Sequence, residues 1–364
     1  MTLEEKIGQL TILSANYAVT GPTMPVDVAA DVRAGRLGSV FNLWGRDAVR
    51  ETQRAAVEES RLGVPLFFAF DVIHGFRTVF PIPLAETGAF DPALWEATAA
   101  HAADEAAAAG LDLTFAPMLD LTRDPRWGRI AEGPGEDPVV GARFAEAKVR
   151  GTQGADLAGP SGLVATAKHF VAYGASVAGR DYAAVEVSDR ALAEIYLPPF
   201  RAAVDAGALA IMPAFTDVAG VPLTGNRALL TGVLREEWGF DGVIVSDYGA
   251  VGELMVHGVA ADRAEAAALA LNAGVDIDMM SLVYRDGLPE ALRRGLTTIA
   301  AVDAAVARVL ELKRRLGLFD DPYRRCAGPD PDTPARRAAR VAASRDAAIR
   351  SLVLLQNRDG ALPL

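Results

Sequence analysis

The sequence has little chemistry for covalent cross-links or metal binding. It contains one cysteine, Cys326, among 364 residues, so an internal disulfide is excluded and a cysteine-based zinc site is not expected. The four histidines are scattered singly along the chain, and none has the spacing of a metal-binding motif: His74, His101, His169 and His257. We therefore expect no metal site.

Long apolar runs and excess positive charge are missing as well. No stretch reaches the roughly 20 apolar residues of a membrane helix. The first residues, MTLEEKIGQLTIL, lack the basic start and apolar core of a signal peptide. They predict an amphipathic helix, with Thr2 as N-cap and Glu5 three residues on. The net charge of −11 argues against nucleic acid and anionic membranes as partners. The compartment stays open, because a removed leader would leave the same sequence.

The chain is instead rich in short apolar runs that alternate with alanine-rich segments of helical period. Strand–helix repetition of this kind predicts a parallel sheet in an α/β fold. No GxGxxG or GxxxxGK motif follows a strand, so no nucleotide cofactor is expected. We predict a TIM-like (β/α)8 barrel with irregular parts, in which seven strands can be placed and an eighth cannot: 38–43, 65–71, 111–120, 163–170, 208–215, 242–248 and 274–280.

The composition changes near the C-terminus. Residues 1–318 form the predicted barrel, and 319–335, rich in Pro, Asp and Arg, are a predicted linker. Residues 336–364 predict a helix followed by the strand SLVLLQN. A lone apolar strand at a terminus has an unpaired edge. Either it docks on the barrel, or, as we favour, it is the first strand of a domain that is incomplete here.

Polar residues follow several of the predicted strands. In a barrel the carboxyl ends of the strands meet on one face, which carries the active site, although any one of these residues could instead cap a helix. Carboxylates accept hydrogen bonds from sugar hydroxyls, and Lys, His and Arg donate to them. The set therefore favours a sugar pocket: Asp71, Asp120, Lys168 with His169, Asp247, and Asp276 with Asp278.

Five motifs carry a resemblance to a known family. The chain resembles glycoside hydrolase family 3 over Thr2–Leu364, most closely its bacterial periplasmic β-glucosidase branch. This implies retaining hydrolysis of terminal β-D-glucosyl or related β-glycosyl residues, without a cofactor, in relatives that are periplasmic or secreted. The motifs are PLFFAFDVIHG (65–75), APMLDLTRDPRWGRIAEGPGEDP (116–138), TAKHFVAYG (166–174), VPLTGN (221–226) and VSDYGA (245–250).

The resemblance implies roles for individual residues. Asp247 of the VSD motif is the expected nucleophile, which forms a covalent glycosyl intermediate. The same sugar ring is expected to bind to Asp71, Lys168 and His169. Neighbours on a regular strand point to opposite faces, so we expect the strand to be distorted at Lys168 and His169.

Further contacts are expected around the ring. Arg129 of the WGR motif and Arg180 in a later loop are expected donors to sugar hydroxyls, Tyr248 is expected to stack on the sugar, and Met212 is expected in the substrate site. Phe215 stands where many relatives have a tyrosine that contacts the nucleophile, so one hydrogen bond to Asp247 should be missing.

Trp127 is interpreted as a packing residue rather than a sugar platform. Glu132 and Glu136 follow Arg129 on its loop and are expected to neutralise arginines there.

The second catalytic carboxylate is expected outside this sequence. Family members of this branch take their acid/base Glu from an α/β-sandwich domain that opens with a helix and strand like AAIRSLVLLQN. Expected partners are thus a β-glucoside or oligosaccharide and a second-domain polypeptide or a second copy of the chain.

Three other functions stay open. The barrel could bind sugar with impaired catalysis. It could be a single-domain β-N-acetylhexosaminidase-like enzyme, although the loop histidine of that subfamily is replaced at Tyr173–Gly174 and Asp181 has no histidine beside it. It could also be an aldolase that uses Lys168 as a Schiff base.

Overall fold

The core of the molecule is a closed parallel barrel. The computed structural model describes residues 1–15 and 27–363. Eight parallel strands are ordered β10-β1-β2-β3-β4-β5-β6-β9, and a parallel bridge between Val245 and Ile277 joins the two ends of this sheet. The strands are β1 (Thr11–Ser14), β2 (Ser39–Phe41), β3 (Phe67–Phe70), β4 (Leu113–Thr114), β5 (Val164–Phe170), β6 (Ala210–Pro213), β9 (Val243–Ile244) and β10 (Asp278–Met279).

The seven predicted strands are confirmed, although each is shorter than its apolar run. The eighth strand, β1, begins inside the N-terminal segment that we predicted as the start of an amphipathic helix. The helix α1 covers only Leu3–Gln9, with the expected capping box between Thr2 and Glu5. β1 then pairs with β2 and β10 and is buried throughout. In a buried strand of four residues all side chains can be apolar. The hydrophobic pattern of such a strand cannot be distinguished from that of the last turn of a helix.

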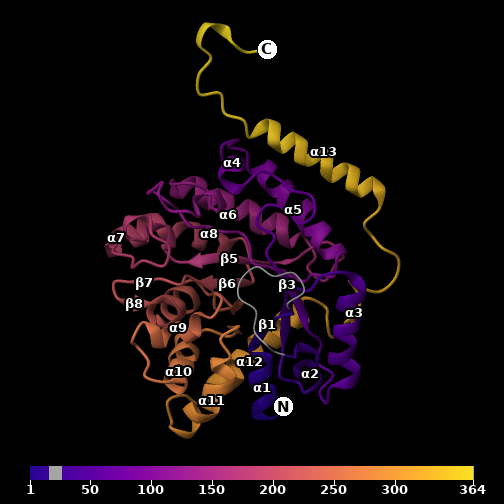
Figure 1. The fold of residues 1–364 in the computed structure, drawn as a ribbon, viewed down its shortest axis with the longest axis vertical. Coiled ribbons are helices and arrows are strands. Elements are labelled where there is room, and N and C mark those ends of the chain that lie inside the picture. Colours follow the sequence, from indigo (N-terminus) through magenta and orange to yellow (C-terminus); the bar gives the residue numbers. More distant parts are fainter. Residues whose placement is uncertain (16–26, 364) are drawn as a thin grey trace.

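Helices cover the outside of the barrel (Figure 1). Strands that helices cover on one face and the barrel core on the other must be apolar throughout, as seen in the sequence. The helices are α2 (Val28–Arg33), α3 (Arg46–Arg54), η1 (Ala55–Glu59), α4 (Pro83–Thr87), α5 (Pro92–Ala108), α6 (Pro138–Gln153), α7 (Asp189–Ala191), η5 (Leu192–Tyr196), α8 (Pro198–Asp205), η7 (Ala228–Glu237), α9 (Ala250–Val256), α10 (Arg263–Ala273), α11 (Val283–Arg293), α12 (Ile299–Arg315) and α13 (Pro334–Arg350).

Short elements complete the rim of the barrel. An antiparallel pair, β7 (Asp217–Val218) and β8 (Val221–Pro222), follows β6. Single 3-10 turns lie in the loops: η2 (Ile130–Glu132), η3 (Tyr173–Ala175), η4 (Val177–Gly179), η6 (Leu223–Gly225) and η8 (Arg358–Gly360). None of the helices in the described part of the chain is both long and apolar enough to cross a membrane.

The C-terminal helix α13 lies along the outside of α4 and α5, and the chain beyond it extends away from the barrel (Figure 1). The strand predicted at 351–357 does not form: this segment has no regular structure, and Leu352 and Leu355 are 80% and 91% exposed. A strand needs a neighbour for its backbone N–H and C=O groups, and none of the described strands pairs with this segment.

Candidate active site

The carboxyl ends of the barrel strands surround a cavity of about 460 Å³. This is the face on which barrel enzymes place their active sites. Residues at or just beyond the ends of β2, β3, β5, β6 and β10 contribute to it, as do the loops that follow β4 and β9. The lining residues are Phe41, Asp71, Phe115, Arg129, Lys168, His169, Tyr182, Met212, Asp247, Tyr248, Glu253 and Met279.

Lys168 and Asp71 form an ion pair across the cavity. The Lys168 Nζ lies 2.8 Å from Asp71 Oδ1, and Lys168 is buried while the Asp71 side chain is 43% exposed. Lys168 and His169 both line the cavity although they are neighbours on β5. The expected distortion is present: the pairing of β5 with β6 shifts register between Lys168 and Phe170, and the Lys168–His169 peptide is cis.

His169 is held in one orientation by Asp120. The Nδ1 atom of the buried imidazole lies 2.8 Å from Asp120 Oδ2, and the His169 backbone N–H donates to the same oxygen. Burial, together with the nearby charges of Arg129 and Lys168, lowers the pKa of His169 well below its usual value. The ring is therefore neutral, and its Nδ1 proton faces Asp120. Nε2 then carries a lone pair and can accept a hydrogen bond.

Arg129 supplies a fixed positive charge beside this ring. Its guanidinium donates two hydrogen bonds to Glu132, from Nε at 2.8 Å and from Nη2 at 3.0 Å. Burial acts to lower the pKa of Arg129, but the hydrogen bonds and charge of Glu132, together with the charges of Asp120 and Asp247, raise it above the usual value. Nη2 also lies 3.4 Å from Nε2 of His169. The expected neutralisation of Arg129 by Glu132 is confirmed.

Asp247 lies on the loop immediately after β9, at the base of the cavity. Its Oδ1 accepts a hydrogen bond from the Tyr248 backbone N–H at 2.7 Å, whereas its buried Oδ2 has no hydrogen-bond partner among the described residues. Burial raises the pKa of Asp247 to about 6, against the lowering effect of Lys168 and Arg129. Asp247 lines the cavity, so the described part of the protein leaves one oxygen of this carboxylate without a hydrogen bond beside the space for a ligand.

The structure brings most of the predicted site residues together. Asp71, Arg129, Lys168, His169, Met212, Asp247 and Tyr248 all line the cavity. Arg180 is exposed and does not line this cavity, and its contact with a sugar ring stays a prediction. Two residues on in the same loop, Tyr182 lines the cavity instead. A left-handed backbone at Tyr182, with a φ of 62°, is a feature that sequence patterns do not reveal.

Glu253 is a second residue that the sequence did not single out. It lies on α9, six residues after Asp247, and lines the cavity mouth. Burial raises the pKa of Glu253 above its usual value. The only signal available in the sequence was the short distance along the chain from Asp247.

Trp127 and Phe215 have packing roles near the cavity. Trp127 is buried, donates from Nε1 to Asp181 at 3.0 Å, and packs against Tyr173. This confirms the packing interpretation. Phe215 packs against Tyr182 with ring centroids 4.7 Å apart. Its ring has no hydroxyl, which agrees with the missing hydrogen bond at Asp247 Oδ2.

Asp276 and Asp278 lie outside the cavity lining. Asp276 is fully buried and pairs with Arg235 at 2.6 Å and Arg308 at 2.7 Å. Asp278 accepts hydrogen bonds from Ser281 Oγ and the Tyr284 backbone N–H. Both carboxylates are satisfied by protein groups, so these two strand-end residues hold the barrel together and do not enlarge the sugar pocket.

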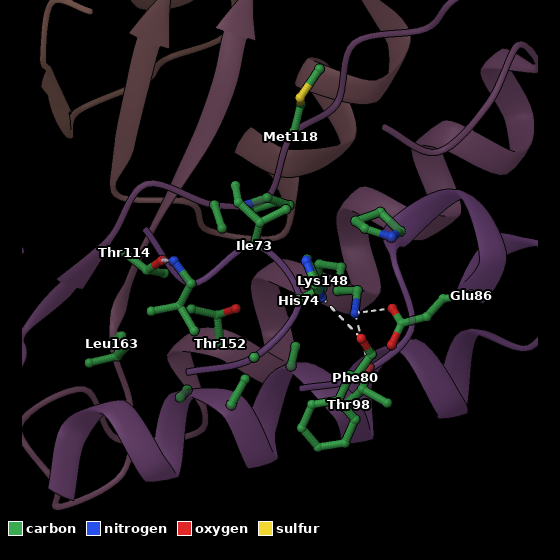
Figure 2. A pocket seen from close by; sticks show the side chains of 18 of the residues that line it. Ile73, His74, Phe80, Glu86, Thr98, Thr114, Met118, Lys148, Thr152 and Leu163 are labelled. Carbon is green, nitrogen blue, oxygen red and sulfur yellow. Dashed lines mark hydrogen bonds and ion pairs between the residues drawn. The ribbon is translucent and has the colours of Figure 1, made fainter. Parts of the chain in front are cut away.

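A smaller, enclosed cavity lies behind the loop that carries Asp71 (Figure 2). Its free volume is about 20 Å³, enough for one water molecule and too small for a sugar. The buried Lys148 on α6 pairs there with Glu86 and donates to Thr98 Oγ1 at 2.9 Å. The loop residues Ile73 and His74 form part of its wall, so the cavity separates this polar cluster from the loop that carries Asp71.

Residues 1–15 and 27–363 contain no group of three or more His, Cys, Asp or Glu side chains that could hold a metal ion. The polar groups of the large cavity instead pair an acceptor carboxylate, Asp71, with donors such as Lys168 and Arg129. This mixture suits a neutral ligand with many hydroxyl groups.

Known proteins similar to this chain agree with that chemistry. A periplasmic beta-glucosidase of Salmonella typhimurium is 42% identical over 369 aligned residues, covering all of this chain and 48% of that protein. A putative beta-xylosidase of Formosa agariphila is 34% identical over 383 aligned residues, which cover all of this chain and 50% of that protein. The crystal structure of a beta-glucosidase from Listeria innocua in complex with isofagomine superimposes with a TM-score of 0.95 at 42% identity, covering all of this chain and 51% of that one.

The chain thus spans about half the length of these relatives. Residues 2–312 match the model of the glycosyl hydrolase family 3 N terminal domain. The barrel, the cavity at its carboxyl face and this match agree, and the chain belongs to glycoside hydrolase family 3, as its N-terminal domain.

Proposed function

We propose that the chain hydrolyses terminal β-D-glucosyl residues, or related β-glycosyl residues, with retention, through a covalent glycosyl intermediate on Asp247. The observation that carries the proposal is the state of Asp247. Asp247 lines a sugar-sized cavity, and its buried Oδ2 has no hydrogen-bond partner among the described residues, while Lys168 and Arg129 counter the effect of burial and favour the ionised form.

The sugar ring is held by the polar groups around Asp247. Asp71 accepts hydrogen bonds from ring hydroxyls, and Lys168, Arg129 and the Nε2 atom of His169 bind the remaining ones as donors or acceptor. Tyr248 and Tyr182 present aromatic surfaces at the cavity wall. Each of these groups is preorganised by a partner in the protein, such as Asp120 for His169 and Glu132 for Arg129.

The reaction proceeds in two displacements. The Asp247 carboxylate attacks the anomeric carbon, the bond from that carbon to the leaving oxygen breaks, and the leaving oxygen takes up a proton. Water then attacks the same carbon, gives up a proton to a base, and releases Asp247. Two inversions give net retention.

The proton donor of the first step and the base of the second are proposed to be one Glu of a second domain. The relatives that this chain matches are about twice its length. We propose residues 1–318 as the catalytic barrel, 319–335 as the linker and 336–364 as the beginning of that domain. The exposed apolar side chains of Leu352–Leu355 are the surface expected of a segment that packs into it.

The names of the relatives support the choice of sugar. Structures of the Listeria innocua beta-glucosidase hold isofagomine, glucose or laminaribiose, and we propose a β-glucoside or oligosaccharide as substrate here. The Salmonella typhimurium relative is described as periplasmic, and we propose the same compartment.

The test compares two substrates. Without the second-domain acid, the 364-residue chain should cleave an aryl β-glucoside of a strongly acidic phenol, whose oxygen leaves unprotonated. It should cleave an unactivated disaccharide slower by about 10²–10⁴-fold, the usual contribution of a general acid. Equal turnover of both would refute the second-domain acid, and no cleavage of either would refute the hydrolase.

A sugar-binding barrel with impaired catalysis is the second candidate. It is favoured by the burial of Asp247, which is 8% exposed, because a carboxylate enclosed by protein cannot reach the anomeric carbon. That protein would bind glucose with the same residues and would not form a covalent adduct at Asp247.

A further inference from the structure

Asp71 begins a compact loop, 71–80, on the rim of the cavity. The loop folds back on itself through an antiparallel bridge between Gly75 and Val79. The Phe80 N–H donates to the His74 carbonyl at 2.8 Å, and the His74 ring donates from Nδ1 to the Phe80 carbonyl at 3.0 Å. These contacts close residues 74–80, and Asp71 precedes them by three residues, so what holds the far end of the loop also restrains the path of the chain that leaves Asp71.

The far end of the loop is held by one buried carboxylate, Glu105 of α5. Its Oε2 accepts hydrogen bonds from the backbone N–H groups of Arg77 at 2.9 Å and Thr78 at 2.7 Å. Its Oε1 accepts a third from the Thr78 hydroxyl at 2.9 Å. Charge-assisted bonds to an ionised acceptor are stronger than neutral ones, so Glu105 is the main anchor of this turn.

The helix α13 reaches the same anchor from outside the barrel. The buried Arg340 has its Nε 3.3 Å from Glu105 Oε1, and its other nitrogens pair with Asp104 and Asp332. Four residues on, Ser344 donates from Oγ to the Val79 carbonyl at 2.6 Å. The helix therefore contacts the loop both directly and through Glu105.

We propose that α13 is a positioning element for the substrate site: Arg340 and Ser344 clamp the loop 71–80 and so hold Asp71 in place to bind the sugar ring. The proposal rests on the proposed function for the role of Asp71. It links the segment that leads toward the second domain with the sugar-binding side of the barrel. Arg340 touches no substrate in this account and acts through Glu105.

The physical basis is the balance of charge around Arg340. One buried guanidinium faces three carboxylates, and a buried charge that loses its partner is costly. When α13 shifts, Glu105 loses the charge of Arg340, the turn at Arg77–Thr78 loosens, and Asp71 leaves its place opposite Lys168.

The test uses the full chain with the substitutions Arg340→Gln and Ser344→Ala. Arg345→Gln is the matched control, because Arg345 lies on the same helix, is exposed, and has no hydrogen bond or ion pair with any of the described residues. The first readout is amide hydrogen exchange. Both test substitutions should speed exchange of the Arg77 and Thr78 amides, and the control should leave their exchange unchanged.

The second readout is the affinity for glucose, in a cycle with Asp71→Asn. Arg340→Gln should weaken glucose binding by about 2- to 30-fold, the range of coupling through a protein network. In the Asp71→Asn background the same substitution should have no further effect. Ser344→Ala, which removes one hydrogen bond at an exposed site, keeps the test valid if Arg340→Gln does not fold.

The outcomes separate the two proposals. Failure of the unsubstituted chain to bind glucose would overturn the proposed function, and the exchange readout would still decide whether α13 holds the loop. Glucose binding that depends on Asp71 but not on Arg340 or Ser344, or additive losses in the cycle, would overturn the positioning role of α13.

Discussion

The imidazole Nε2 of His169 lies 3.4 Å from Oδ2 of Asp247. Because the Nδ1 proton of the same ring faces Asp120, Nε2 presents a lone pair to the carboxylate and cannot donate to it. The ring thus leaves Oδ2 without a donor while it fixes the cavity wall beside it. Nε2 and the Asp247 carboxylate are thus two acceptors beside the cavity that both residues line, and a sugar hydroxyl bound in that cavity can donate to one of them.

The raised pKa of Asp247 predicts an acidic limit on its reactivity. Only the ionised carboxylate attacks, so the fraction that can react falls as the pH falls below about 6. We expect the second-order rate of covalent trapping by a 2-fluoro glucoside with an acidic phenol leaving group to drop about tenfold per pH unit below that value. A rate that stays level down to pH 4 would contradict a buried Asp247 with a raised pKa.

Lys168 should affect the pH below which covalent trapping of Asp247 becomes slower. Its positive charge lowers the pKa of Asp247 against the effect of burial. Lys168→Gln should therefore move the acidic limit to higher pH and should also weaken glucose binding, since a donor and the partner of Asp71 are lost. The trapping rate as a function of pH measures the first effect. An unchanged or lower limit would show that Lys168 does not act on Asp247 through its charge.

The buried charge of Asp247 should also lower the free energy of unfolding at neutral pH. Above pH 6 both the folded and the unfolded chain carry the charge, but only the folded chain buries it. A shift from 3.8 to about 6 corresponds to about 3 kcal/mol at most. Asp247→Asn should therefore be more stable than the unsubstituted chain at pH 7. The gain should shrink as the pH falls toward 4, where both states become protonated.

Urea unfolding of the two chains at pH 7 and pH 4.5 measures this difference. A less stable Asp247→Asn chain at pH 7 would mean that the carboxylate is satisfied in the fold and is a structural residue.

Replacing Asp276 with Asn should lower the stability of the protein, in contrast to the same substitution at Asp247. It is a fully buried carboxylate between Arg235 and Arg308 and also accepts from the Ile244 N–H. Asp276→Asn leaves the two arginines without their charge partner, and we expect a loss of about 3–5 kcal/mol of unfolding free energy. Glucose affinity of the folded protein should be unchanged. Lost affinity in a chain of normal stability would place Asp276 in the site instead.

The sequence predicted the barrel because its strands are apolar and regularly spaced between helical segments. It missed β1, whose residues Thr11–Ser14 follow α1 without a turn signal. It overpredicted a strand at 351–357, because hydrophobicity indicates a strand only where a partner strand is available. Local patterns thus identified elements, and pairing decided which of them form.

For the site, the motifs located residues at the strand ends, and seven of the eight predicted site residues line the cavity. Arg180 lies outside the lining, on a loop in which Ala178 and Tyr182 have positive φ values that local patterns do not reveal. Tyr182 and Glu253 were missed for the same reason. They reach the cavity through the path of a loop and the start of a helix, and no periodicity encodes either.

The most direct test of the account is to trap the intermediate. The chain is incubated with 2,4-dinitrophenyl 2-deoxy-2-fluoro-β-D-glucoside, digested, and the peptides are examined by mass spectrometry. We expect one fluoroglucosyl group, attached to Asp247, and no adduct in Asp247→Asn. A chain that binds glucose and yields no adduct, or an adduct on another carboxylate such as Glu253, would contradict the assignment of Asp247 as the nucleophile.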